Sequence, residues 1–148
     1  MPREVDYLAQ LRFLIEGVHP QFQVGQVRYQ ALPGKPLLPE LADVPRIEEY
    51  RSMLACFHVA MASAGGEGGR APSMGRGRRE RYVFTRRSLE ACARLWVSLR
   101  RRAPEACPRS QLASVLTTVY LNKLSPGADR KAAIGLAEVA GLPVEEGM

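Results

Sequence analysis

Apolar residues recur every three or four positions over five stretches of the chain, and this period predicts five amphipathic helices. The pattern is clearest over 86–102, where Leu89, Trp96 and Leu99 fall on one side. Glycines and prolines follow most of these stretches and are expected to end the helices. The five predicted helices span about 3–17, 45–63, 86–102, 108 or 110 to just before Pro126, and 128–140.

Two shorter stretches, residues 22–32 and 81–85, alternate apolar and polar residues as a half-buried strand does. Residues 64–79 contain six glycines, so this segment buries too little apolar surface to offset the entropy of ordering its backbone. The prediction is a mainly α fold with about five helices, one or two short strands and a flexible Gly/Arg-rich basic loop. We expect a single domain over 1–148, with 64–80 as a mobile basic insertion.

The composition is that of a globular protein, since 46% of the 148 residues are hydrophobic and 24% are charged. Three cysteines without a C-x-x-C pair, and only two histidines, predict neither a structural zinc site nor a disulfide framework. No apolar run approaches the length of about 18 residues that a membrane span needs. Acidic residues stand near the start, where a signal peptide carries basic ones. We therefore expect a cytoplasmic protein with no membrane association.

The positive charge is concentrated in one part of the chain. The net charge is +6, but residues 1–63 and 103–148 each carry a net −1. Residues 64–102 hold eleven arginines against three glutamates, a net +8 within 39 residues. Clustered arginines favour a polyanionic partner, because a guanidinium binds a phosphate through two parallel hydrogen bonds. A merely solvated surface and an acidic protein partner are the alternatives.

The helix predicted over 86–102 is expected to carry a row of arginines opposite its apolar side. Arg87, Arg94 and Arg101 recur every seven residues, which is about 10.5 Å along a helix axis. Only Glu90 interrupts the positive charge, whereas exposed helices usually mix both signs. The predicted nucleic-acid-binding residues are ten arginines of the loop and this helix: Arg70, Arg76, Arg78, Arg79, Arg81, Arg86, Arg87, Arg94, Arg101 and Arg102.

The glycine-rich segment does not fit a nucleotide-binding loop. A P-loop needs four residues between its glycines and then Lys-Ser/Thr, whereas Gly69 and Gly75 enclose five residues and Arg76-Gly77 follow. The run Gly-Arg-Gly-Arg-Arg instead resembles arginine and glycine segments that bind nucleic-acid backbones and become ordered on binding.

The sequence contains no catalytic constellation, because it has no H-E-x-x-H motif, no G-x-S-x-G motif and no paired-acid spacing. His58, Cys56 and Cys92 fall on the apolar faces of predicted helices, which is typical of core residues. We expect a protein that is not an enzyme and that binds no cofactor and no metal.

Residues 79–124 resemble a ribbon-helix-helix unit, with a short strand at 81–85, a helix from Arg86, a turn, and a second helix opened by Arg109-Ser110-Gln111-Leu112. In that family two chains pair their strands, and the outward strand residues contact the major groove of DNA. The resemblance implies that Arg79, Arg81, Val83 and Thr85 face DNA, and that Tyr82 and Phe84 face the helices.

The whole chain is similar in size, charge and number of helices to the small helical subunit of CRISPR effector complexes, which stacks along guide and target strands without catalysis. Both resemblances imply a non-enzymatic protein that binds RNA or DNA, as a homo-oligomer or as a subunit of a larger complex. The alternative is an adaptor or inhibitor that docks on an acidic protein surface, such as that of the transcription machinery. In that case the strand at 27–32 would add to the edge of a partner's sheet.

Overall fold

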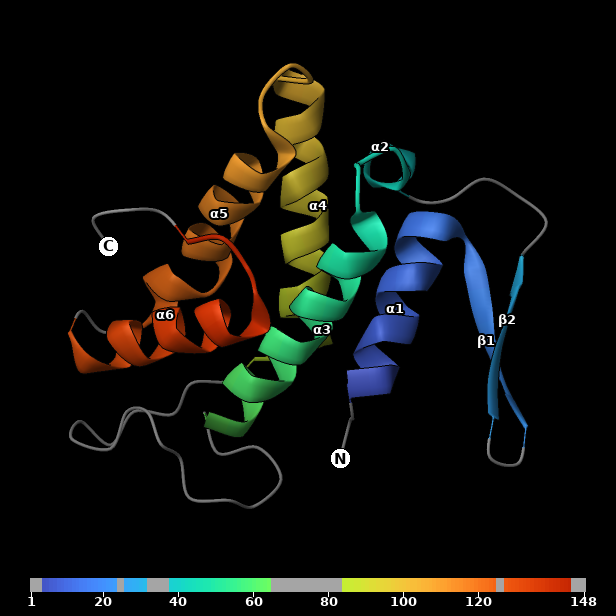
Figure 1. Cartoon of the computed structure of the whole chain (residues 1–148), viewed down its shortest axis with the longest axis horizontal. Helices are drawn as coiled ribbons and strands as arrows, with labels where there is room; N and C mark the ends of the chain where they lie inside the picture. Colours follow the sequence, from blue (N-terminus) through green and yellow to red (C-terminus); the bar gives the residue numbers. More distant parts are fainter. Residues whose placement is uncertain (1–3, 24–25, 32–37, 65–83, 125–126, 145–148) are drawn as a thin grey trace.

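The computed structural model describes residues 4–23, 26–31, 38–64, 84–124 and 127–144. These residues form a mainly helical structure, as predicted, in which a hairpin of two strands follows the first helix (Figure 1). The elements, in chain order, are α1 (Glu4–Glu16), β1 (Val18–Gln23), β2 (Gln26–Ala31), α2 (Pro39–Ala42), α3 (Ile47–Ala64), α4 (Arg86–Arg102), α5 (Pro108–Val119), the 3-10 helix η3 (Leu121–Lys123) and α6 (Ala128–Ala140).

The helices predicted over 86–102 and 128–140 are confirmed at both ends as α4 and α6. α1 and α3 begin and end within two residues of their predicted limits. The fourth predicted helix ends earlier, because α5 stops at Val119 and the chain continues as η3. The period does not predict α2, which is only four residues long and has Pro39 in its first turn, a residue that reads as part of a loop.

β1 and β2 pair antiparallel, with Gln23 opposite Gln26 at the connected ends of the strands. The alternating pattern predicts one strand over 22–32, and Pro20 is expected only to close the helix before it. In the structure Pro20 lies within β1, and a proline is tolerated in a strand at the edge of a sheet. Gly17 has a φ of 68° and links the end of α1 to the start of β1.

The second predicted strand, over 81–85, is described only at Phe84 and Thr85, and neither residue is in a strand. Phe84 is buried, and Thr85 stands directly before α4 as its N-terminal cap. Because the backbone of Thr85 begins a helix, it is not available for pairing with a strand. The insertion predicted over 64–80 lies outside the described residues except for Ala64, the last residue of α3.

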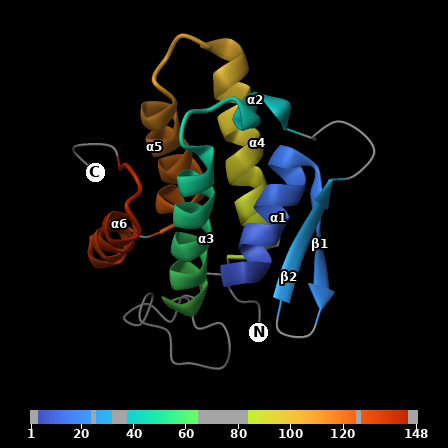
Figure 2. The ribbon, with the colours of Figure 1, turned by 45° about the vertical axis from the view of Figure 1, so that its right-hand side comes forward.

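Two pairs of helices make up the body of the structure. α4 and α5 lie side by side as a helical hairpin, and α1 packs against α3 (Figure 1). α2 contacts both α1 and α4, and α6 packs against α3 and η3. Figure 2 shows the β-hairpin beside α1, on the side of the molecule away from α6. α1 is therefore the helix that supports the hairpin, through its contact with β1.

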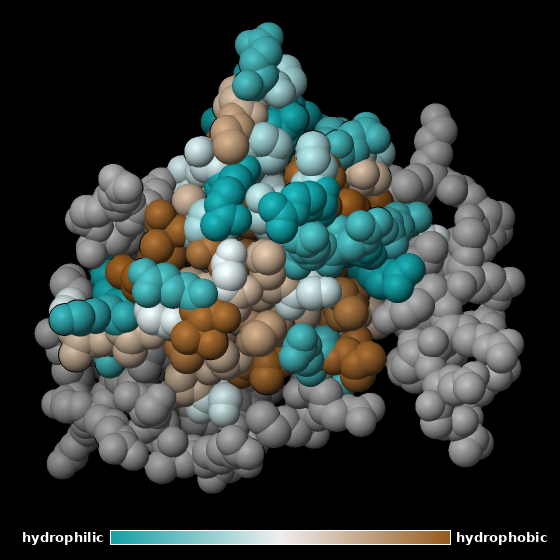
Figure 3. Space-filling view, in the orientation of Figure 1, coloured by the Kyte–Doolittle hydropathy of each residue, from teal (hydrophilic) through white to brown (hydrophobic). Residues whose placement is uncertain are grey.

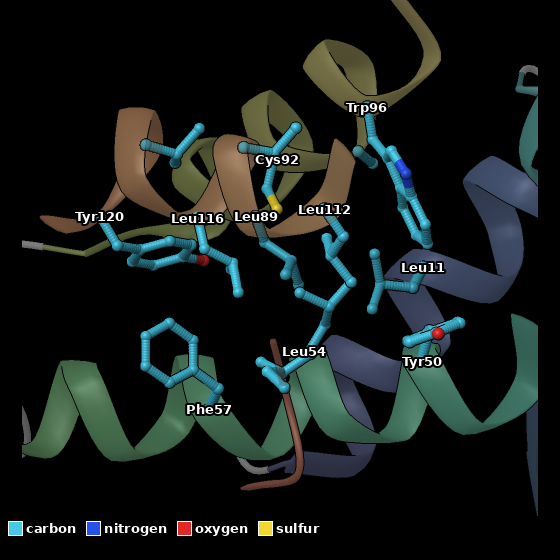
Figure 4. Close-up of a cluster of buried hydrophobic side chains, with 14 of the residues drawn as sticks. Leu11, Tyr50, Leu54, Phe57, Leu89, Cys92, Trp96, Leu112, Leu116 and Tyr120 are labelled. Carbon is cyan, nitrogen blue, oxygen red and sulfur yellow. The ribbon is translucent and has the colours of Figure 1, made fainter. Parts of the chain in front are cut away.

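The core lies where α3 faces α4 and α5 (Figure 4). Tyr50 of α3 meets Trp96 of α4 edge to face, with ring centroids 5.7 Å apart, and Phe57 meets Tyr120 in the same way at 5.1 Å. Trp96 and Tyr120 are fully buried. Aromatic pairs prefer this geometry, so these contacts hold the α4–α5 hairpin against α3 and fix which side of α4 faces solvent.

Outside the β-hairpin, Val139 of α6 is the one large hydrophobic residue among the described residues that is exposed. Figure 3 shows hydrophilic residues gathered toward the end of the molecule at which α4 meets α5. The surface beside the C-terminal end of α4 is therefore polar.

Candidate nucleic-acid interface

The start of α4 is fixed by hydrogen bonds from its own cap and from α1. The backbone N–H of Thr85 donates to Ser88 Oγ at 3.3 Å. Gln10 of α1 donates from Nε2 to the carbonyl of Arg86 at 3.0 Å. Ser88 and Leu89 are buried, so the inner side of the helix begins in its first turn. The first arginines of the predicted site therefore stand on an anchored helix end.

The other end of α4 is held by a polar network of Arg100 and Gln111. The side-chain amide of Gln111 donates to the carbonyls of Leu99 and Ala103, both at 3.0 Å, and these carbonyls also accept the backbone N–H groups of Ala103 and Ala106. Arg100 donates to Gln111 Oε1 at 3.1 Å and to the carbonyl of Ala106 at 2.8 Å. Arg100 is thus engaged within the fold, and it is not one of the ten arginines of the predicted site.

The five predicted site residues that the structure describes are all exposed on α4: Arg86, Arg87, Arg94, Arg101 and Arg102. The side chains of Arg94 and Arg101 are 55% and 63% exposed. Trp96 and Cys92, on the apolar side, are fully buried. α4 therefore has the predicted division into a buried apolar side and an exposed row of Arg87, Arg94 and Arg101, which we call the arginine row.

Two members of the arginine row are paired with carboxylates. Arg94 Nε donates to Glu90 Oε1 at 2.9 Å, and Arg101 Nε donates to Glu40 Oε1 of α2 at 2.7 Å. Within the described ranges Arg87 forms no ion pair. The row is therefore less positive than the sequence predicts. Sequence reasoning missed Glu40, because it comes from a helix that the apolar period does not reveal.

Glu40 is held in its ionised form by its arginine partner. The hydrogen bond from Arg101 is the main cause that lowers the pKa of Glu40 below its ordinary value. The other carboxylate oxygen, Oε2, is buried and has no hydrogen-bond partner among the described residues. Because the side chain of Arg101 is 63% exposed, its ion pair with Glu40 contributes only about 0.2–1 kcal/mol.

The other half of the predicted site lies outside the described residues: Arg70, Arg76, Arg78, Arg79 and Arg81. The same is true of Tyr82 and Val83, which the ribbon-helix-helix resemblance assigns to a strand. The structure thus brings the arginines of α4 together on one helix and gives no position for the arginines of the loop.

The histidine and cysteine residues of α3 and α4 differ in how deeply they are buried. His58 is fully buried, as predicted, with Nδ1 at 2.8 Å from the hydroxyl of Tyr120. Burial lowers the pKa of His58 to about 4 and raises the pKa of the buried Cys92 to about 12. The prediction for Cys56 is wrong, since it is exposed on α3. The residues on either side of it occupy the buried positions of that turn.

Comparisons with known proteins gave no match, either to a family model or to a curated protein or solved structure. In the part of the chain that the structure describes, no group of histidine, cysteine or acidic side chains could hold a metal ion. No described helix combines the length and the apolarity needed to cross a bilayer. The arginine row is therefore the feature on which a function can be argued.

Proposed function

We propose that this protein is a non-enzymatic nucleic-acid-binding protein that contacts the phosphate backbone through the arginine row of α4. The observation that carries the proposal is the exposure of three arginines at intervals of seven residues, at steps of about 10.5 Å along one side of a helix. Gln10 and Gln111, from other helices, anchor the two ends of α4. The row is therefore presented on a preorganised element, which lowers the entropy cost of binding.

The charge of α4 favours a polyanion. The helix carries six arginines and one glutamate, and Arg100 alone among the arginines is engaged by the α4–α5 turn. The ion pair of Arg94 is exposed at both partners and that of Arg101 at its guanidinium, so both are weak, whereas a phosphate offers each guanidinium a bidentate contact. Phosphate contacts position a protein without reading bases, so we expect binding with little sequence preference.

Two finer functions lie within this proposal. One is a small helical subunit of a ribonucleoprotein, similar to that of CRISPR effector complexes, and the other is a DNA-binding regulator of the ribbon-helix-helix kind. The mainly helical structure, with an arginine row suited to a phosphate backbone, favours the ribonucleoprotein subunit. The second needs a strand over 81–85, and the two described residues of that segment, Phe84 and Thr85, are not in one.

The salt dependence of binding tests the proposal. A labelled strand of roughly 30 nucleotides, as single- or double-stranded DNA or RNA, is titrated at about 50 to 200 mM salt. The triple variant Arg87→Gln, Arg94→Gln, Arg101→Gln should reduce the slope of log K against log salt by about 2 to 3. The reason is that each phosphate contact contributes about 0.7 to 0.9 to that slope.

A matched control removes three exposed cations elsewhere: Arg109→Gln, Lys123→Gln and Lys131→Gln. It lowers the net charge by the same amount and should leave the slope nearly unchanged. Equal slopes for the row variant and the wild type would contradict the proposal. So would the absence of binding to all four ligands at low salt, and that result would favour the alternative of an adaptor on an acidic protein surface.

A further inference from the structure

The pairing of β1 with β2 determines which backbone groups of the hairpin face outward. Only two residues separate Gln23 from its partner Gln26, so this pair must exchange its hydrogen bonds directly. Hydrogen-bonded and non-hydrogen-bonded pairs then alternate along the hairpin. The non-hydrogen-bonded pairs are Phe22 with Val27, Pro20 with Tyr29, and Val18 with Ala31. The backbone N–H and C=O groups of these residues face away from the partner strand.

The two outer edges of the hairpin therefore differ. On β1 the outward position at the centre is Pro20, which has no N–H group to donate. On β2 the outward positions are Val27, Tyr29 and Ala31, and each has both a donor and an acceptor. Among the described residues the sheet has only these two strands. The outer edge of β2 is thus a complete hydrogen-bonding edge that no described strand occupies.

β2 also lacks the features by which edge strands usually avoid pairing. It contains no proline, no lysine and no acidic residue, and Arg28 is its single charge. Among the described elements its main contacts are with β1, and β1 in turn packs on α1. A ribbon of two strands is marginally stable unless a third strand or a helix supports it, so an added strand along β2 would stabilise the hairpin.

We infer that β2 pairs antiparallel with β2 of a second copy of this chain, about a two-fold axis at Tyr29. In this register Tyr29 lies opposite the partner's Tyr29. Val27 lies opposite the partner's Ala31, and by symmetry Ala31 lies opposite the partner's Val27. All outward groups of both strands are then paired. The register also places Arg28 opposite the partner's Gln30, whereas a shift of the axis to residue 28 would oppose two like charges.

Pairing with a second copy of this chain gives an assembly that stops at the dimer. The dimer has a four-stranded sheet in the order β1, β2, partner β2, partner β1, so each outer edge is a β1 strand interrupted by Pro20. A sheet with such edges cannot grow further, and the two-fold pairing is isologous and closed. This inference does not rest on nucleic-acid binding, and its test uses protein freed of nucleic acid by nuclease treatment.

Sedimentation equilibrium of the full chain from about 5 to 500 µM tests the inference, since an interface this small assembles weakly. We expect a reversible monomer–dimer equilibrium. Tyr29→Pro removes an outward donor at the two-fold axis and should weaken the dimer at least about tenfold. Phe22→Pro is the matched control, because it removes an outward donor of β1, and it should leave dimerisation unchanged. Circular dichroism reports whether both variants remain folded.

A second pair of variants does not depend on a proline. Gln30→Glu places a carboxylate opposite the partner's Arg28 twice across the two-fold axis and should strengthen the dimer about two- to thirtyfold at low salt. Gln30→Lys places like charges there and should weaken it. A wild type that stays monomeric over the whole range would overturn the inference. Dimerisation of Tyr29→Pro at wild-type strength, or equal effects of the two Gln30 variants, would do the same.

Discussion

Glu40 of α2 and Arg101 of α4 are joined by a 2.7 Å hydrogen bond between Oε1 and Nε, across 61 residues of sequence. The pair ties α2 to the outer side of α4 and places a carboxylate against the last member of the arginine row. A phosphate that binds this guanidinium must compete with Glu40 for its donors. We therefore expect Glu40 to oppose the proposed binding of a polyanion at the C-terminal end of the row.

The substitution Glu40→Gln should strengthen nucleic-acid binding by up to about fivefold at low salt. The ion pair that a phosphate has to break is exposed at Arg101 and is worth about 0.2–1 kcal/mol. The affinity is measured with the same labelled strands at about 50 mM salt. Glu138→Gln removes an exposed acid of α6 and should change the affinity much less. A lower affinity for Glu40→Gln would show that the pair positions Arg101 for binding instead of competing with it.

The arginine row could be predicted from the sequence because it is a local property of one helix. Cys92 and Trp96 fix the buried side of α4, and the exposure of Arg94 follows from its angle to them. The pairing of Arg101 with Glu40 could not be predicted in this way. It depends on where a four-residue helix packs, and no periodic pattern in the sequence specifies that contact.

Arg100 shows the same limit within one run of basic residues. In the sequence it is the first of three consecutive arginines, and it falls closer than the other two to the apolar side of the helix, but the sequence does not predict what it contacts. In the structure its guanidinium donates to the carbonyls of Pro104 and Ala106 and to Gln111 Oε1. These acceptors exist only because the chain turns back after α4, so the partners of Arg100 are set by tertiary structure.

Because His58 is buried, we expect the free energy of unfolding to decrease as the pH falls below neutrality. Burial lowers the pKa of His58 from 6.5 to about 4, so between these values the unfolded chain takes up a proton that the folded chain does not. The free energy of unfolding therefore falls through this window. From pH 7 to pH 5 the loss from this one residue is about 2 kcal/mol.

Urea unfolding near pH 7, 6 and 5 measures this loss. His58→Gln cannot titrate there, so its stability should depend less on pH over the same interval, although the variant is less stable at neutral pH. Its amide must replace an imidazole that lies 2.8 Å from the hydroxyl of Tyr120. NMR gives the pKa of His58 in the folded protein. A value near the ordinary pKa of histidine would show that His58 does not cause the pH dependence of stability.

Cys107 is predicted to be the most reactive of the three cysteines. It is exposed at the N-terminal cap of α5, and hydrogen bonds from the backbone N–H and the hydroxyl of Ser110 lower the pKa of its thiol. Partial desolvation and, to a smaller extent, the charge of Glu4 raise the pKa of the exposed Cys56, whereas full burial raises the pKa of Cys92 to about 12. The thiolate is the reactive form, so iodoacetamide should modify Cys107 first, Cys56 more slowly, and Cys92 only after unfolding.

The variant Ser110→Ala separates the effect of hydrogen bonding on Cys107 from that of exposure. It removes the hydroxyl that donates to the thiolate but leaves the backbone N–H in place, so the alkylation rate of Cys107 should fall without being abolished. The rate at Cys56 serves as the internal reference and should stay the same. Timed modification near neutral pH, followed by peptide mass spectrometry, gives all three rates in one sample. If Cys56 reacts as fast as Cys107 in the wild type, exposure alone governs reactivity and the hydrogen bonds from Ser110 have no effect on the thiol.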